Sequence, residues 1–262
     1  MDWCPSWDGS AYAANTTHHR VHDAAFLDTC PLRPTDRVLD IGCGSGDFTR
    51  TIADLVPHGE VVGTDPQPSM LIEAAARAGA NQRFVVAPAQ HLVDALGETG
   101  GFDVAVSRAV FHWIPAADTP AAHRQVHDQL TPGGRFRLEC GGAGNIPASV
   151  ALLDEVSSRL GGPTCPWNFA SASWALDTLE QAGFDVRAGF VRLVAQRRTF
   201  DIDSLRGWLH SQVLQAYTST MDEDAARAFT AEVDGRVGEL RRGDGTFDQT
   251  WVRLDALVQH PA

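Results

Sequence analysis

Short apolar runs alternate with longer amphipathic segments through the first half of the chain. The runs are rich in Val, Ile, Leu and Phe and end in turn-forming residues, which is typical of strands buried on both faces of a sheet. Five strands are expected, at residues 37–41, 60–64, 83–87, 102–107 and 135–140. Helical periodicity predicts helices between them at residues 47–56, 69–78, 89–96 and 120–130. Strands that alternate with helices indicate an α/β fold with a mostly parallel sheet.

The segments around this block are mainly helical. Helices are expected at residues 11–27, 145–160, 173–182, 202–216 and 223–240, an extended segment at 184–194 and a last strand at 247–258. No linker separates these parts, so we expect a single domain over residues 1–262. Its core is expected to comprise about residues 31–200 and the strand 247–258, and its helical cap residues 1–30, 145–170 and 202–242.

Charge and composition limit the kinds of partner that the protein can bind. The formal net charge is −12 at pH 7, and a negative field repels nucleic acid and anionic membrane surfaces. All 21 residues counted as Lys or Arg are arginine, which excludes Schiff-base chemistry and the lysine of a phosphate-binding P-loop. We therefore expect neither nucleic acid nor a membrane as a partner. The composition leaves the oligomeric state open.

The cysteines and the first residues bear on the compartment. Five cysteines, an odd number without a CxxC pair, are typical of a reduced intracellular protein. The polar N-terminus has no apolar run of signal-peptide length, and no stretch approaches the ~18 apolar residues of a membrane-spanning helix. These features predict a cytoplasmic protein.

Three glycines follow the first predicted strand. Gly42, Gly44 and Gly46 form G-x-G-x-G after Asp40, whereas the dinucleotide fingerprint is G-x-G-x-x-G. Asp65 ends the second strand 23 positions after Gly42, a spacing at which a carboxylate accepts hydrogen bonds from a ribose diol. The loop favours a ligand that approaches the backbone closely. Two alternatives remain, a plain strand–turn–helix with packing glycines and a nicotinamide-binding site.

Three motifs together resemble the class I S-adenosylmethionine-dependent methyltransferases. They are D-x-G-C-G-x-G, the acid that ends the second strand, and L-x-P-G-G before the fifth strand. The stretches FHWIP and ECGGAGN are similar to the small-molecule branch, which includes trans-aconitate-type and ubiquinone-biosynthesis-type enzymes. The resemblance, over roughly residues 10–200, implies a Rossmann-like seven-stranded sheet in the order 3-2-1-4-5-7-6, with the last strand antiparallel.

The resemblance also implies S-adenosyl-L-methionine as cofactor and methylation of an oxygen, nitrogen or carbon atom of a small molecule, in bacterial metabolism or natural-product biosynthesis. An NAD-dependent oxidoreductase and a catalytically inactive cofactor-binding or scaffold protein are the alternatives. Carried over by position, the cofactor-binding residues are Asp40, Gly42, Cys43, Gly44, Gly46, Asp65, Pro66, Gln67, Met70, Ala89, Gln90, Ser107, Arg108 and Ala109. The family's usual acid after the third strand is absent, so Gln90 or a backbone carbonyl is expected to recognise the adenine.

His112 and Glu139 follow the fourth and fifth strands and are the candidate catalytic residues. Each has a structural alternative, since His112 can cap the pocket wall and Glu139 can pair with an arginine. The candidate substrate-binding residues are Tyr12, Asn15, His19, His112, Trp113, Asn145, Trp167 and Phe169. Trp167 and Phe169 can equally be core residues of the cap. His18 and His22 share a helix face but lack a third ligand, so no metal site is expected.

Overall fold

A seven-stranded sheet forms the main body of the protein. The computed structural model describes residues 23–97 and 100–262. Its strands are β1 Arg37–Ile41, β2 Glu60–Asp65, β3 Gln82–Val86, β4 Phe102–Arg108, β5 Leu130–Gly141, β6 Asp185–Phe200 and β7 Phe247–Gln259. Their order is β3-β2-β1-β4-β5-β7-β6, and β7 runs antiparallel to both of its neighbours. The sheet expected from the sequence is therefore confirmed, including the antiparallel last strand.

Helices cover both faces of this sheet. The helices are α2 Asp23–Asp28, α3 Asp47–Leu55, α4 Pro68–Ala75, α5 Leu92–Leu96, α6 Thr119–Gln129, α7 Pro147–Arg159, α8 Ala172–Ala182, α9 Ile202–Gln212, α10 Leu214–Thr218 and α11 Glu223–Arg236. One buried cluster joins α2 and α3 to β1, β2 and β4, through residues such as Phe26, Ile52 and Val104. A second joins α6 and α8 to the other face, through Val126, Phe136 and Leu179. The central strands are apolar because both of their faces are buried.

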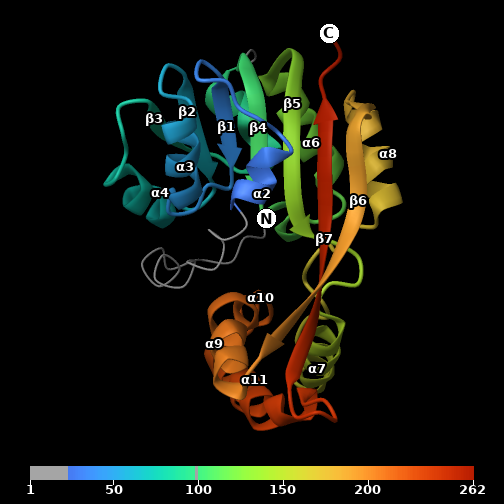
Figure 1. Cartoon of the computed structure of the whole chain (residues 1–262). Helices are drawn as coiled ribbons and strands as arrows, with labels where there is room; N and C mark the ends of the chain where they lie inside the picture. The colour runs from blue at the N-terminus through green and yellow to red at the C-terminus, as the bar shows by residue number, and fades with distance from the viewer. Residues whose placement is uncertain (1–22, 98–99) are drawn as a thin grey trace.

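A second lobe extends from the carboxyl end of the sheet. In Figure 1, β6 and β7 continue past the other strands as a two-stranded ribbon, and α7, α9, α10 and α11 gather around its far end. These elements share their own apolar cluster, in which Tyr217, Phe229 and Leu205 are fully buried. Buried apolar surface therefore stabilises this lobe separately from the sheet. The single-domain boundary remains a prediction.

Several element limits differ from the expectation. The segment 184–194 is part of a longer strand, because β7 pairs with β6 as far as Phe200 and supplies the hydrogen bonds that a polar stretch lacks on its own. The helix expected at 202–216 is two helices that break at Val213, and the helix at 223–240 ends in a 3₁₀ turn. The segment 89–96 is a 3₁₀ turn followed by α5.

The helix expected at residues 11–27 lies mostly outside the described residues, within which α2 begins at Asp23. Among the helices of residues 23–97 and 100–262, none combines the length and the apolar character needed to cross a bilayer.

Candidate functional site

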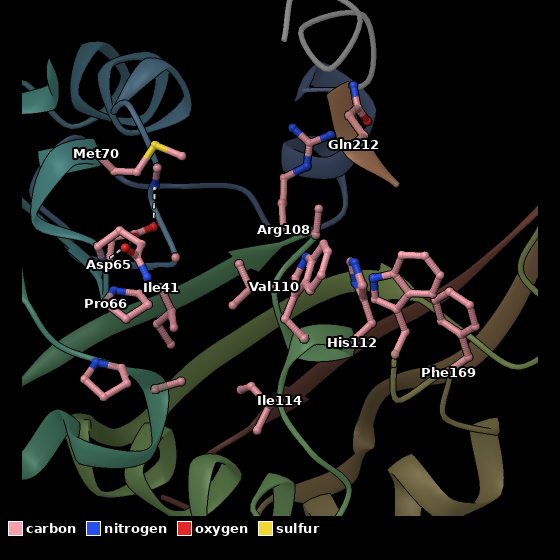
Figure 2. A pocket seen from close by; sticks show the side chains of 18 of the residues that line it. Ile41, Asp65, Pro66, Met70, Arg108, Val110, His112, Ile114, Phe169 and Gln212 are labelled. Atoms are coloured by element: carbon pink, nitrogen blue, oxygen red, sulfur yellow. Dashed lines mark hydrogen bonds between the residues drawn. The ribbon is translucent and has the colours of Figure 1, made fainter. Parts of the chain in front are cut away.

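A cavity of about 460 Å³ lies at the carboxyl ends of β1, β2 and β4. Open parallel sheets bind ligands at this edge, and the volume falls in the usual range for small-molecule sites. One end of the cavity is formed by the glycine loop, Asp65, Pro66 and Met70. The other end lies beside His112 and Phe169 (Figure 2). We call these the loop end and the aromatic end.

The glycine loop needs glycine at Gly42. This residue has φ +70°, and a Cβ there would lie 2.1 Å from Cγ2 of Val110, which also lines the cavity. The backbone N–H groups of Gly42 and Cys43 donate to the carbonyl of Thr64 at 2.7 and 2.9 Å. The loop is thereby held against β2, and its backbone borders the cavity without side chains in between.

Asp65 lies at the loop end with its carboxylate fixed by two backbone donors. The N–H of Gly44 donates to Oδ2 at 3.1 Å, and the N–H of Gln67 donates to Oδ1 at 2.9 Å. Burial raises the pKa of this carboxyl, and the two backbone hydrogen bonds oppose that shift. Each oxygen keeps a lone pair for a further donor, so the carboxylate can accept both hydrogens of a ligand diol.

Two cavity-lining residues have a backbone conformation that only glycine adopts readily. Ala109 has φ 58° and Ile146 has φ 43°, and they are the non-glycine residues with positive φ in the part of the chain that the structure describes. Ala109 follows β4, where its N–H donates to the carbonyl of Glu139 at 2.7 Å. Backbone strain of this kind clusters at functional sites, and here both instances border the same cavity.

His112 lies at the aromatic end in a defined protonation state. The backbone N–H of Gly141 donates to its Nδ1 at 3.2 Å, so Nδ1 is the bare nitrogen and Nε2 carries the hydrogen. Burial, and secondly the charge of Arg253, lower the pKa of His112 to about 3. The ring is therefore neutral near pH 7, and it can donate a hydrogen bond through Nε2 but is poorly suited to accept a proton.

Aromatic side chains from both lobes border the aromatic end. His112, Trp113, Trp167 and Phe169 contact one another in sequence, with Trp113 and Trp167 5.8 Å apart and Trp167 stacked on Phe169 at 5.5 Å between ring centroids. We call these four residues the first wall. Phe169 fits because Gly141 has no side chain, since a Cβ there would lie 2.7 Å from the Phe169 ring.

The second wall consists of Trp208 from α9 and Trp251 from β7, whose ring centroids are 5.4 Å apart. Arg253, two residues further along β7, lies on the same face of the strand, with its guanidinium carbon 4.8 Å from the Trp251 ring centroid. Burial lowers the pKa of Arg253, and the nearby Glu139 opposes this shift. Among the described residues Arg253 has no hydrogen bond and no ion pair, although its guanidinium borders the cavity.

The structure brings most of the predicted site residues together. Ten of the predicted cofactor residues line the cavity, namely Gly42, Gly44, Asp65, Pro66, Gln67, Met70, Ala89, Gln90, Arg108 and Ala109. His112, Trp113, Asn145, Trp167 and Phe169 of the predicted substrate set line it as well. Tyr12, Asn15 and His19 lie outside the described residues. The roles assigned to all these residues remain predictions.

Five predicted residues do not border the cavity, namely Asp40, Cys43, Gly46, Ser107 and Glu139. Three of them stand directly behind its wall. Asp40 accepts the hydroxyl hydrogen of Thr49 at 2.6 Å, and the hydroxyl of Ser107 donates to the carbonyl of Ile41 at 3.1 Å. The carboxylate of Glu139 lies 3.9 Å from the guanidinium of Arg108. That position suits electrostatic support of Arg108 better than contact with a ligand.

Sequence reasoning missed the part of the site that comes from β7 and the second lobe. These residues are Trp208, Gln212, Val213, Trp251 and Arg253, together with Ile41, Ala87, Pro88, Val110, Ile114 and Ile146 nearer the motifs. The available signal was the alternation of Trp251 and Arg253 on a predicted strand, which places both on one face. Within the described residues, no group of three or more His, Cys, Asp or Glu could hold a metal ion.

Comparisons with known proteins agree with this geometry. Residues 39–136 match a family described as a methyltransferase domain. A trans-aconitate 2-methyltransferase of Deinococcus radiodurans is 31% identical over 75% of this chain and 77% of that protein. Another trans-aconitate 2-methyltransferase, from Methylobacterium nodulans, is 27% identical over 89% of both chains.

Solved structures share the fold. The YcgJ protein of Bacillus subtilis matches with a TM-score of 0.64 at 19% identity, over 93% of this chain and all of the other. Phosphoethanolamine N-methyltransferase 2 of Haemonchus contortus, solved with S-adenosyl-L-methionine, matches with a TM-score of 0.62 at 17% identity. That match covers 97% of this chain and 57% of the other.

Proposed function

This chain belongs to the S-adenosylmethionine-dependent methyltransferases, and we propose that it methylates a carboxylate oxygen of a small organic acid. The enzyme class, the methyl donor and a small-molecule acceptor follow from the family. Neither the oxidoreductase alternative nor the inactive-scaffold alternative receives support from the comparisons. The chemical nature of the acceptor and the role of each residue are the proposal.

The loop end of the cavity fits the methyl donor. Bound there, S-adenosylmethionine supplies a methyl group on a sulfonium, a leaving group that needs no further activation. We assign the backbone of Gly42 and Gly44 to the amino-acid part of the donor and the Asp65 carboxylate to its ribose diol. Pro66, Met70 and Gln90 border the space left for the adenine. The lining of the cavity supports this assignment, because the loop reaches it at Gly42 and Gly44, where no side chain stands between the backbone and a ligand.

The observation that carries the acceptor assignment is the guanidinium of Arg253. Arg253 is half-buried and has no hydrogen bond or ion pair among the described residues, which is costly for a cation, and an anionic ligand would reduce that cost. Arg253 borders the cavity beside His112, whose Nε2–H is a second donor for the same anion. A guanidinium and an imidazole N–H together suit the two oxygens of a carboxylate.

The chemistry of the aromatic end also favours an acceptor that is already ionised. Near pH 7 a carboxylate oxygen attacks the methyl carbon with its own lone pair, the new O–C bond forms as the C–S bond breaks, and sulfur retains the electron pair. No proton moves, so no general base is needed. His112 is neutral with Nε2 protonated, and Glu139 stands behind the wall, so the acceptor half of the described cavity holds no evident base.

The relatives support the same class of acceptor. The relatives from Deinococcus radiodurans and Methylobacterium nodulans are named as methyltransferases of trans-aconitate, which is a carboxylic acid. Carboxylic acids are therefore the first acceptors to test. In this chain, Arg253 would neutralise the charge of the acceptor, and Arg253 and His112 together would align it with the methyl group. Alignment alone lowers the barrier of such a displacement.

The donor half is tested by calorimetric titration with S-adenosylhomocysteine and, separately, with NAD. Asp65→Asn removes the charge that holds the diol and is expected to lower the affinity for S-adenosylhomocysteine about ten- to hundredfold. This is the usual contribution of hydrogen bonds to a charged group. Asp94→Asn is the matched control, because the Asp94 side chain is 83% exposed and lies on α5, away from the cavity. Equal affinity in both variants would contradict the role of Asp65.

The acceptor half is tested with acids and their neutral analogues, the corresponding alcohols and amides. The expected product is a methyl ester, recognised by methanol that mild alkali releases from it. Arg253→Gln is expected to raise KM for the acid about ten- to hundredfold. Arg206→Gln, the same change on an exposed face of α9, should leave it unchanged. Alkali-stable methylation of an alcohol or amide, or an unchanged KM in Arg253→Gln, would overturn the carboxylate proposal.

A further inference from the structure

Two aromatic walls from different parts of the chain enclose the acceptor half of the cavity. The first wall follows β4 and continues in the segment after α7, and the second comes from α9 and β7. Within each wall the ring centroids are 5.4 to 6.1 Å apart. Since both walls border one cavity, the space between them suits a flat ligand whose faces contact rings on either side.

The number of lining cations limits the charge of that ligand. Arg108 and Arg253 are the basic residues other than His112 among the described lining residues. The charge of Arg108 already has a partner, because the Glu139 carboxylate lies 3.9 Å from its guanidinium, which also packs on the rings of Phe26 and Phe48 at 5.2 and 4.9 Å. Figure 2 shows Arg108 directed toward Gln212 and away from Phe169. Arg253 is therefore the cation that remains for the acceptor.

An acid with several carboxylates fits this space poorly. One carboxylate can pair with Arg253 and His112, but each further carboxylate would lie against indole and phenyl faces. Aromatic faces carry partial negative charge and repel anions, and burying an unpaired carboxylate is costly. The same faces attract an aromatic ring, for which stacking adds about two- to tenfold in affinity beyond the area buried.

We propose that the acceptor is a planar aromatic or aryl-conjugated acid with a single carboxylate, held with its ring between the two walls and its carboxylate at Arg253. This inference rests on the proposed carboxylate methylation and specifies its substrate class. It separates this chain from an enzyme suited to small polycarboxylates. Trp208 and Trp251 then determine specificity, whereas Arg253 recognises the group that all acids share.

The test compares trans-cinnamate, an aryl-conjugated monocarboxylate, with trans-aconitate, which shares the alkene carboxylate but carries two further carboxylates. Benzoate, indole-3-acetate and citrate complete the panel. Binding to the enzyme loaded with S-adenosylhomocysteine and kcat/KM with the methyl donor are both measured. We expect kcat/KM for the best aromatic acid to exceed that for trans-aconitate at least about a hundredfold, because binding trans-aconitate would leave two carboxylates unpaired.

Trp208→Leu separates aromatic recognition from charge recognition. It is expected to lower kcat/KM for the aromatic acid at least about tenfold, leave trans-aconitate nearly unchanged, and keep the affinity for S-adenosylhomocysteine. Trp174→Leu is the matched control, because Trp174, on α8, packs against the sheet core and does not border the cavity. Unaltered thioether affinity and thermal midpoint establish that each variant is folded.

The outcomes separate this inference from the proposed function. A preference for trans-aconitate or citrate overturns the inference and leaves carboxylate methylation intact. The inference is also overturned if no aromatic acid binds the enzyme loaded with S-adenosylhomocysteine with a Kd below about 1 mM. Methylation of cinnamyl alcohol or cinnamamide with no methylation of acids would overturn both. Equal losses for aromatic and polycarboxylic acids in Trp208→Leu would show that the walls do not select the ring.

Discussion

At the scale of single residues, His112 shows how a backbone contact sets chemistry. Its position after the fourth strand suggested either a base or a wall residue, and both readings suit the same sequence. The N–H of Gly141 occupies Nδ1, and burial lowers the pKa of the ring to about 3. The interaction therefore favours His112 as a neutral hydrogen-bond donor that positions the acceptor.

This protonation state predicts the pH profile of the reaction. Because the pKa of His112 is lowered, the ring stays uncharged as the pH falls from 8 to about 5, and it would gain a proton only near pH 3. With a carboxylic acid as acceptor and saturating donor, kcat should change less than about twofold between pH 6 and 8. A base with an ordinary histidine pKa would instead lose activity about tenfold per unit below pH 6.5. Such a limb, absent in His112→Asn, would contradict the positioning role.

At the scale of elements, the segment that carries the first wall is tied to two helices. Oδ1 of Asp154, on α7, accepts the N–H of Cys165 at 2.6 Å and the hydroxyl hydrogen of Tyr217, on α10, at 2.7 Å. The Tyr217 side chain is fully buried and also lies edge-on to Trp167, 5.6 Å between centroids. One carboxylate thus connects the second lobe to the segment in which Trp167 and Phe169 stand.

Removing one of these bonds should weaken the second lobe. Tyr217→Phe keeps the ring but leaves the half-buried Asp154 carboxylate with one donor fewer, which is expected to lower the free energy of unfolding by about 1–2 kcal/mol. Asp154→Asn keeps a carbonyl acceptor and should cost less. Chemical denaturation measures both. S-adenosylhomocysteine affinity should not change in either variant, since the loop end, to which we assign the donor, lies on the sheet. A loss of that affinity would mean that the loop end and the second lobe are coupled.

At the scale of the whole molecule, β7 connects the sheet, the second lobe and the cavity. It pairs with β5 in the sheet, continues with β6 into the second lobe, and supplies Trp251 and Arg253 to the cavity. Within the sheet, its Asp255 lies 2.6 Å from the guanidinium of Arg137 on β5, at an angle that is not that of a hydrogen bond. Arg137 also donates hydrogen bonds to the hydroxyl of Thr29 and the carbonyl of Ala256, at 2.9 and 3.1 Å. It therefore connects the segment that follows α2 to β7.

The Asp255 carboxylate has two arginine partners of opposite exposure, which makes a matched test. The Arg137 side chain is 3% exposed and the Arg192 side chain is 55% exposed. Arg137→Met removes a buried charge and is expected to cost about 3–5 kcal/mol of unfolding free energy, while Arg192→Met should cost about 0–1 kcal/mol. Equal losses in thermal or urea unfolding would show that burial does not govern this pair.

The loop end could be predicted from the sequence because its parts are local. A strand, three glycines and an acid at the end of the next strand fix one another's positions through neighbouring parallel strands, so Gly42, Gly44 and Asp65 fall together wherever this pattern forms. The same spacing could not place Ser107 and Glu139, because alternation along a strand decides whether a side chain points into the cavity or away from it, and a shift of one residue in register reverses that direction.

The sequence by itself determined the strands of the sheet and the glycine loop beside Asp65, since periodicity and short-range spacing encode them, and the family resemblance implied the strand order. The tertiary structure decided the aromatic end of the cavity. Trp208 and Trp251 lie far along the chain from the motifs, and a second lobe built around the ends of β6 and β7 brings them to the cavity. The protonation of His112, and the fact that no described residue pairs with Arg253, were likewise outside the sequence, because both depend on which groups from distant segments lie within hydrogen-bonding distance.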